Sequence, residues 1–504
     1  MTKHLFKKPR SITTELERLK KASPSVWEKK GERMIIALAN HAQDDLPAYK
    51  DYLHKVKLKT RHIKTIDDFR ELPLLTKADY LKKADYPQLF FPKTIPEITT
   101  VAATSGSTGE PFFFPRGEHQ DDQYAYVAEI FLRNQFDIQK KSSLILIGFG
   151  LGIWIGGIFT YKCFNKVAQK GYKMALVPAG SIPDTYLKSI KKFGHLYDQI
   201  ILTGYPPFVK DIVDQGAEYD IDWSKYHVKV MTAAENFSEQ YRDYLANKLH
   251  IKNIYRDIVN VYGTVELGTM AHETAFTTLI KRLALNKKEL YEDLFLSDKQ
   301  VPTLAQYYPH MVWLEETQGE VVGTGVGSMI PLVRYRFLDR GGVYSYESML
   351  DIMKRHGIDI MKEVKKVEIA DTIMKLPFVY VYDRIDNSVV LRGANIYAQN
   401  IRDALTQEAI SKYLTGKFSM LKKNDRSENP YLEVNVELKK GRTPSVQIKK
   451  EIEMHLVVGL RKVNSEYNYL YGADSESVIP KIVLWHYGDP THFAGGKQRW
   501  VKKS

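Results

Sequence analysis

Cysteine is almost absent from this chain of 504 residues, whose only thiol is Cys163. A single cysteine excludes disulfides within the chain and makes a cysteine-based zinc or iron–sulfur site implausible. The basic segment from Met1 to Lys20 also lacks the apolar core of a signal peptide. We therefore expect a protein that works in the cytoplasm.

Long apolar runs are scarce as well. The longest uncharged stretch runs from Ser142 up to Lys162, which is long enough to cross a membrane. It carries five glycines between Gly148 and Gly157, however, and this spacing is typical of a buried strand followed by a loop. We expect no membrane association.

Positive charge is in excess, with a formal net charge of +13 and a pI near 9.2. A nucleic-acid-binding protein would gather its lysines on one face with aromatic residues between them. Here the lysines are spread along the chain in short clusters such as Lys7-Lys8 and Lys365-Lys366. Attraction of anionic substrates such as nucleotides explains the excess about as well, so nucleic-acid binding stays the second hypothesis.

Segments of strand and helix character alternate in the middle of the chain, after a first hundred residues of helical pattern. Strands are expected over residues 143–149, 173–177, 199–203 and 227–232. This alternation predicts the α/β class with a mostly parallel, doubly wound sheet, in which ligands bind at the carboxyl ends of strands. A strand-rich region over residues 311–340 predicts a small β subdomain or barrel.

The pattern changes near residue 386. Alternating apolar and polar residues over 432–438 predict a half-buried strand, and residues 446–463 form an amphipathic helical pattern. We predict a large N-terminal domain of several subdomains over residues 1–385, and a small, mobile α+β C-terminal domain over residues 386–504.

The segment Thr104-Ser105-Gly106-Ser107-Thr108-Gly109-Glu110-Pro111 follows the apolar run 101–103. Its glycines allow a sharp turn that brings backbone N–H groups close to an anion, and its hydroxyls add donors. It is not the Walker loop, because no Gly-Lys-Ser/Thr ends it. The pattern indicates a cradle for phosphate oxygens, with an ordinary polar surface turn as the alternative.

Three other loops follow strand signals, namely Gly204-Tyr205, Ala233–Asn236 and Tyr262–Glu266. In a parallel sheet such loops converge on one crevice. The glycines of residues 148–157, beside Trp154, suit either an apolar ligand or close packing of backbone against a helix, and both readings stay open. The predicted walls of an apolar acid pocket are Phe149, Leu151, Trp154 and Tyr205.

Five motifs occur in an order that resembles a known family. They are Thr104–Pro111, Val261–Glu266, Arg334–Asp339, Arg384–Asp386 with Leu391–Gly393, and Gly495–Arg499. They resemble the successive motifs of the adenylate-forming superfamily of acyl- and aryl-CoA ligases. Leu72–Lys77 and Arg392–Tyr397 favour the branch of phenylacetate–CoA ligase and the related capsule-biosynthesis-associated proteins. The resemblance spans roughly Leu72 to Lys502.

The resemblance implies a reaction in which a carboxylate attacks the α-phosphorus of ATP, so that cations and donors must offset the repulsion of two anions. Glu266 would ligate Mg²⁺, and Thr264 would touch the α-phosphate. The outgoing phosphates would be held by Ser105, Gly106, Ser107, Thr108 and Gly109. The remaining nucleotide contacts would come from Ala234, Glu235 and Tyr262 with Gly263 at the adenine, Asp339 at the ribose hydroxyls and Arg384 at ribose or phosphate.

Two residues of the C-terminal domain complete the implied site. Lys497 follows Gly495-Gly496 and would be the catalytic lysine, because its ammonium is a compact charge on a long stem. A surface lysine in a basic tail is the alternative. Asp386 would be the hinge on which the small domain rotates between the two steps of the reaction.

The chain departs from the family pattern in three places. Asp383 stands where the family has a glycine before the hinge arginine. The lysine that many relatives carry after the phosphate loop is missing, and whether Arg116 compensates is open. The metal-binding cysteines of some relatives are also missing.

The predicted function is that of an ATP-dependent, AMP-forming acid ligase with ATP, Mg²⁺ and CoA as cofactors. It would convert an aryl or otherwise apolar acid into an acyl-adenylate with release of pyrophosphate, and then pass the acyl group to CoA. A carrier-protein thiol, an amine or a sugar is the alternative acceptor. The resemblance also implies a homodimer. Retention of Glu266, Asp339 and Lys497 argues against a non-catalytic relative.

Overall fold

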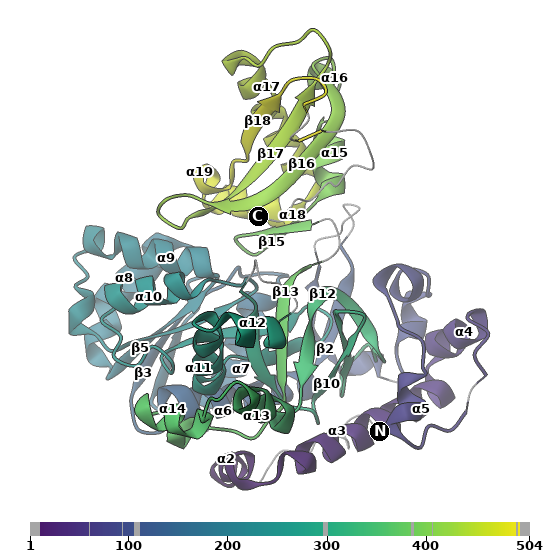
Figure 1. Ribbon diagram of the computed structural model, residues 1–504, viewed down its shortest axis with the longest axis vertical. Helices are drawn as coiled ribbons and strands as arrows, with labels where there is room; N and C mark the ends of the chain where they lie inside the picture. Colours follow the sequence, from purple (N-terminus) through teal and green to yellow (C-terminus); the bar gives the residue numbers. More distant parts are fainter. Residues whose placement is uncertain are drawn as a thin grey trace. The chain divides into compact units, whose positions relative to one another are not determined.

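The computed structural model describes residues 11–59, 61–92, 94–104, 111–295, 301–384, 388–405, 407–489 and 492–493. Its contacts divide the chain into two compact units (Figure 1). The larger unit comprises Met1–Ala102, Phe113–Gly204 and Val209–Tyr382, and the smaller unit comprises Ala103–Phe112, Tyr205–Phe208 and Asp383–Ser504. The functional domains predicted over residues 1–385 and 386–504 stay a prediction.

The larger unit begins with helices, as the sequence predicts. They are α2 (Ile12–Lys21), α3 (Pro24–Asp45), α4 (Pro47–Lys55) and α5 (Ile66–Arg70). Thr65 and Asp68 form a capping box at the start of α5, in which the Thr65 hydroxyl accepts from the Asp68 N–H at 3.1 Å and the Asp68 carboxylate accepts from the Thr65 N–H at 2.9 Å. Thr76 also caps a helical turn, but that turn, Lys77–Leu81, is a π-helix.

An eleven-stranded sheet forms the centre of this unit, in the spatial order β10-β11-β12-β13-β9-β8-β7-β6-β5-β3-β4. Strands β3 to β7 pair in parallel. Their bounds are β3 (Ser143–Gly148), β4 (Met174–Val177), β5 (Gln199–Gly204), β6 (Val228–Ala233) and β7 (Ile258–Thr264). The helices that alternate with them are α6 (Glu118–Phe136), α7 (Ile155–Ala168), α8 (Pro183–Phe193), α9 (Pro206–Gln215) and α10 (Glu239–Lys248). The predicted α/β class is confirmed.

In the other half of the sheet the neighbouring strands run antiparallel in the pairs β10–β11, β11–β12, β13–β9, β9–β8 and β8–β7. This half contains β8 (Gly268–His272), β9 (Thr303–Tyr307), β10 (Val312–Thr317), β11 (Glu320–Gly325), β12 (Tyr335–Tyr344) and β13 (Phe378–Arg384). The strands predicted over residues 311–340 are therefore present, but they do not form a separate barrel. They extend the large sheet, because an unpaired sheet edge accepts an antiparallel strand as readily as a parallel one.

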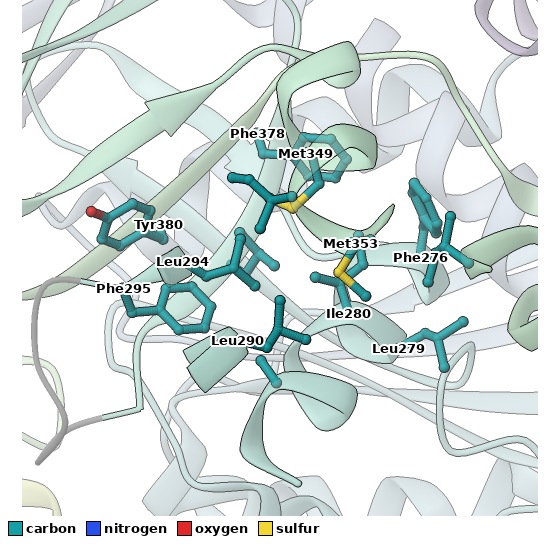
Figure 2. Packing of buried hydrophobic residues seen from close by; sticks show 14 of the residues in the cluster. Phe276, Leu279, Ile280, Leu290, Leu294, Phe295, Met349, Met353, Phe378 and Tyr380 are labelled. Atoms are coloured by element: carbon teal, nitrogen blue, oxygen red, sulfur yellow. The ribbon is translucent and has the colours of Figure 1, made fainter. Parts of the chain in front are cut away.

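Four helices bury an apolar face against this antiparallel half. They are α11 (Ala275–Leu285), α12 (Lys288–Leu294), α13 (Tyr346–Arg355) and α14 (Ile360–Lys366). Figure 2 shows Phe276 and Ile280 of α11, Met349 and Met353 of α13 and Phe378 of β13 gathered into one apolar cluster. All of these side chains are buried, so the cluster ties the helices to the sheet.

The smaller unit is an α+β structure, as predicted. It contains the hairpin β14 (Ser388–Leu391) with β15 (Ala394–Tyr397), and a sheet of β16 (Leu414–Asn424), β17 (Pro430–Leu438) and β18 (Lys481–Trp485). Its helices are α15 (Ala398–Leu405), α16 (Glu408–Ser411), α17 (Val446–Val463), α18 (Ser465–Ala473) and α19 (Ser475–Val478).

Strand β17 differs from the prediction of a half-buried strand. Its alternate residues Glu433 and Glu437 are buried along with the apolar ones. Each has a lysine partner on β16, with Lys423 Nζ 2.8 Å from Glu433 Oε1 and Lys417 Nζ 3.3 Å from Glu437 Oε2. The strand lies in the middle of its sheet, where pairing allows carboxylates to be buried.

None of the helices among the described residues is long and apolar enough to cross a membrane.

Candidate active site

The motif Tyr262–Glu266 lies at the carboxyl end of β7 and forms a hairpin with β8. Thr264 is the last residue of β7 and pairs with Gly268, so Glu266 lies in the turn. The Thr264 hydroxyl accepts a hydrogen bond from the Leu267 N–H at 3.3 Å, which closes the turn. A side chain at Gly263 would meet the Gly268 carbonyl oxygen at 2.6 Å, so only glycine fits there. The motif is a strand end with a tight turn rather than an open loop.

Tyr262 and Asp339 are joined although they lie far apart in the sequence. The Tyr262 hydroxyl donates to Asp339 Oδ2 at 2.6 Å, and the side chain of Asp339 is buried. Tyr335, near the start of β12, donates its hydroxyl to Glu266 Oε1 at 3.4 Å. The second and third motifs therefore meet at the carboxyl end of β7.

Backbone irregularity on β12 sets the position of Asp339. Val322 of β11 pairs with Arg336 of β12, whereas its neighbour Val321 pairs with Asp339. The residues between Arg336 and Asp339 therefore form a bulge in β12. Leu338, inside this bulge, has a φ of +66°, in the left-handed region that L-residues rarely adopt. Such strain persists only where the surrounding structure holds it, and it often lies at functional sites.

The segment Leu72–Lys77, which favours one branch of the family, pairs with the start of the third motif. The Leu75 N–H donates to the Arg334 carbonyl oxygen at 3.0 Å, and the Arg336 N–H donates to the Leu75 carbonyl oxygen at 2.9 Å. The Arg334 guanidinium also donates to the carbonyl oxygens of Arg70 and Leu72. This segment thus supports the strand that carries Asp339.

Ala234 and Glu235 follow β6, the parallel neighbour of β7. Ala234 is exposed and has a φ of +72°. Glu235 is buried, and its carbonyl oxygen accepts from Asn260 Nδ2 of β7 at 3.0 Å. Because β5, β6 and β7 pair in parallel, their carboxyl ends lie at one edge of the sheet, as predicted.

Arg116 is the residue of this region whose role the sequence left open. It lies on β2 (Phe113–Gly117), and its side chain is 1% exposed. Nη2 donates to the carbonyl oxygen of Val265, between Thr264 and Glu266, at 2.7 Å. Burial lowers the pKa of Arg116 to about 10, so the guanidinium stays charged at neutral pH. The one sequence feature that could have indicated a role for Arg116 is its position within an apolar strand, shortly after the Ser/Thr/Gly segment.

Several predicted residues lie outside the described part of the chain. These are Ser105, Gly106, Ser107, Thr108, Gly109, Asp386 and Lys497. Arg384 is the last residue of β13, but its side chain is not described. On either side of the Ser/Thr/Gly segment, β1 (Ile98–Ala103) and β2 pair as a two-stranded sheet. The roles of these residues stay predictions.

The glycine-rich segment after β3 uses its glycines for packing. A side chain at Gly157 would collide with the Gly150 carbonyl oxygen, and one at Gly156 would meet Phe149 Cβ at 3.1 Å. Phe149 is 1% exposed. These contacts favour the reading of backbone packed closely against the start of α7.

The four predicted pocket residues are not gathered by any of these contacts. Leu151 packs near Gly157 and Gly180. Trp154 precedes α7 and is partly exposed. Tyr205 belongs to the smaller unit, where its ring lies against Gly393. The acid pocket therefore stays a prediction.

His272, near the same strands, has a structural environment. It is fully buried, with Nε2 2.9 Å from the Tyr308 hydroxyl and Nδ1 2.8 Å from the Glu273 carbonyl oxygen. Burial lowers the pKa of His272 to about 4, so the ring is neutral at physiological pH. This agrees with a structural role.

Comparisons with known proteins give one curated relative and a consistent fold. No family model matches the chain. The chain is 20% identical over 434 residues to phenylacetate–coenzyme A ligase of Escherichia coli (strain K12), a match that covers 85% of this chain and 86% of that protein.

Solved structures of 2-hydroxyisobutyryl-CoA ligase match along nearly the whole chain. One, in complex with 2-HIB-AMP and CoA in the thioesterification state, is 15% identical with a TM-score of 0.67 and covers 97% of this chain and 91% of its own. A second, in the postadenylation state with R3-HIB-AMP, is 14% identical with a TM-score of 0.56 and covers 97% and 92%. The chain therefore has the fold of the adenylate-forming CoA ligases, and in sequence it is similar to phenylacetate–CoA ligase, as its motifs predict.

Proposed function

We propose that this protein is an ATP-dependent, AMP-forming acid–CoA ligase. It would join a carboxylic acid to the α-phosphate of ATP with release of pyrophosphate, and then transfer the acyl group to CoA with release of AMP. The similarity to phenylacetate–CoA ligase over most of both chains and the shared fold support this activity.

The observation that carries the proposal is the hydrogen bond between Tyr262 and Asp339 at 2.6 Å. These residues come from two motifs to which the resemblance assigns the adenine and the ribose. A carboxylate accepts two hydroxyl donors well, and an aromatic ring beside it offers a face for a base. Their contact puts an aromatic ring beside a carboxylate, which would suit the base and the ribose of one nucleoside.

Glu266 is proposed as the Mg²⁺ ligand. Among the described residues no three His, Cys, Asp or Glu side chains gather into a ready-made metal site. A single carboxylate suits Mg²⁺, which takes its other ligands from substrate phosphates and water. Bound Mg²⁺ would offset the negative charge of the phosphates. Thr264, two residues away, would then touch the α-phosphate.

An aryl or otherwise apolar acid is the proposed substrate, and CoA is the proposed acceptor. Partly exposed Leu151 and Trp154 supply apolar surface close to the carboxyl end of β3. A carrier-protein thiol, an amine or a sugar stays the alternative acceptor, since the described residues do not discriminate among them.

The test is release of pyrophosphate from ATP and Mg²⁺ over a panel of aryl, aliphatic and hydroxy acids, with and without CoA. We expect release with aryl or apolar acids and formation of an acyl-CoA when CoA is added. Pyrophosphate release that CoA does not accelerate would move the acceptor to a carrier protein, an amine or a sugar. A protein that neither binds ATP nor releases pyrophosphate would refute the proposal.

Two substitutions test the assigned roles. E266Q removes the proposed Mg²⁺ ligand and should reduce pyrophosphate release at least a hundredfold, while E289Q, at an exposed position of α12, serves as its control. K497A should reduce adenylate formation to a similar degree, with K502A as the control for the basic tail. Unchanged release by K497A would refute its catalytic role.

A further inference from the structure

Arg116 is a fully buried cation beneath the turn that carries Thr264 and Glu266. It reaches this turn from a distant part of the chain, because β2 and the β7–β8 hairpin are about 150 residues apart in sequence. Its hydrogen bond to the Val265 carbonyl oxygen is 2.7 Å long. Hydrogen bonds from a charged donor are about twice as strong as neutral ones, so this contact restrains the turn.

The guanidinium packs against an aromatic ring. Its central carbon is 4.4 Å from the ring centroid of Phe159 on α7. A side chain at Gly268, whose φ is +79°, would meet Nη1 at 3.1 Å and the Phe159 ring at 3.5 Å, so glycine leaves room for this contact. The contact suits a planar group that stacks on an aromatic ring, which arginine provides and lysine does not.

No carboxylate within the described ranges forms an ion pair with Arg116. Asp121, the closest candidate on α6, is paired with Lys162 instead. Within the same ranges Nε and Nη1 also have no hydrogen-bond partner. The negative charges of Asp121 and Glu266 favour the charged guanidinium, but burial outweighs them and lowers the pKa of Arg116. A buried cation that lacks a directly paired carboxylate is costly, so a purely structural role would favour an uncharged side chain here.

We propose that Arg116 is a positioning residue for the nucleotide and metal site. By holding the Val265 carbonyl group it fixes the turn, so that Thr264 and Glu266 are presented in the geometry that Mg²⁺ and the α-phosphate require. This inference rests on the proposed function, because it concerns the same site.

The test uses the full-length variants R116Q and R116K. In a titration of Mg²⁺ at fixed ATP, followed by the thermal shift of the protein, R116Q should need about ten times more Mg²⁺ for half of the effect. In pyrophosphate release its kcat should fall at least tenfold, while the KM for the acid stays within twofold. R116K keeps the charge but not the planar fork, and should recover part of both losses.

R256Q is the matched control. Arg256 donates to the carbonyl oxygens of Gln135 and Asn134 at 2.8 and 3.0 Å, so it also restrains backbone. It pairs with Asp137 at 2.9 Å, and none of its hydrogen bonds or ion pairs among the described residues reaches the hairpin. Its Mg²⁺ dependence should be that of the wild type. An R116Q variant with wild-type Mg²⁺ dependence and kcat would overturn the inference, and if R116Q does not fold, the same readouts on R116K decide.

The proposed function is tested separately on the wild-type protein. If the wild type shows no shift with ATP and Mg²⁺ and releases no pyrophosphate, both the function and this inference fail. If the wild type responds and the Arg116 variants respond equally, only the inference fails.

Discussion

The two ends of β7 are each held by a buried arginine, and the two arginines differ in what surrounds them. At the amino end Arg242 Nη1 donates to the Ile258 carbonyl oxygen at 2.6 Å. Just past the carboxyl end Arg116 Nη2 donates to the Val265 carbonyl oxygen at 2.7 Å. Both side chains are at most 1% exposed, so burial does not distinguish them.

Their ion pairs do distinguish them. Arg242 lies 3.0 Å from Glu239 Oε2 and 2.8 Å from Glu273 Oε2. Burial opposes its charge, but the two carboxylates outweigh burial and raise the pKa of Arg242 above its ordinary value. For Arg116 burial dominates and lowers the pKa to about 10. A buried charge whose ion pairs outweigh burial is typical of structural support, and one for which burial outweighs the nearby charges is a candidate for function.

Replacing each arginine by methionine should distinguish structural support from a functional role most clearly. R242M leaves Glu239 and Glu273 short of a partner, and we expect a loss of about 3–5 kcal/mol in the free energy of unfolding. R116M removes a cation that forms no ion pair with the described carboxylates, so its loss should be smaller, about 2 kcal/mol for the hydrogen bond from a charged donor. Thermal and urea unfolding measure both. Equal losses in the two variants would contradict the distinction.

Acid should weaken the amino end of β7. Burial alone would raise the pKa of Glu239, but Arg242 and Lys281 outweigh burial and lower it to about 2. The folded pKa is thus below the unfolded value of 4.5, so the stabilisation is complete above about pH 5 and is lost as the pH falls towards 2. The shift corresponds to about 3 kcal/mol. Urea unfolding at several pH values measures it, and R242M should flatten the dependence.

The Tyr262–Asp339 contact should affect nucleotide binding more than folding. Y262F removes the hydroxyl that orients the Asp339 carboxylate, and we expect a roughly tenfold rise in the KM for ATP, as for the loss of one hydrogen bond to a charged group. Pyrophosphate release measures it. The control is Y344F, which removes a hydroxyl bonded to the Leu294 carbonyl oxygen at 2.9 Å. An equal effect of both variants would argue against a specific role of Tyr262.

The smallest expected effect concerns strain at the carboxyl edge of the sheet. Ala234 has a φ of +72°, which glycine adopts without cost, so A234G should raise the free energy of unfolding by about 0.5–1 kcal/mol. A233G, one residue earlier within β6, should lower it by a similar amount. Chemical denaturation compares the two. A loss in both variants would show that the backbone at Ala234 is not strained.

Much of the fold was predictable because the signals are local. Leu144 to Ile147 are consecutive apolar residues, and the structure buries all four in β3, the strand next to the edge strand β4, with parallel neighbours on both sides. Thr65 and Asp68 form the capping box that their spacing predicts. The strands over residues 311–340 were recognisable from the sequence, but their continuity with the large sheet was not. Which strands pair depends on which sheet edge the folded chain leaves unpaired, and this is not visible in the sequence.

The candidate site was predictable where a motif carries its own chemistry. Glu266, Tyr262 and Asp339 were identified from residue types in a family order, and the hydrogen bond between the last two agrees with their common assignment to the nucleoside. The glycines beside Trp154 suited two readings in the sequence. Only the packed backbone shows that Gly156 and Gly157 are used for close contact with Phe149 and Gly150.

The sequence alone determined the α/β class, the order of the motifs and the residue types of the candidate nucleotide site. These depend on periodicity and on chemistry that neighbours in the chain share. Tertiary structure decided which charges are compensated. Arg116 and Arg242 are both single arginines in their segments, and their partners come from β7 and the turn after it, from α7, from α10 and from Glu273, which follows β8. Electrostatic energy depends on distance in space, so burial and pairing separate the two only once the chain is folded.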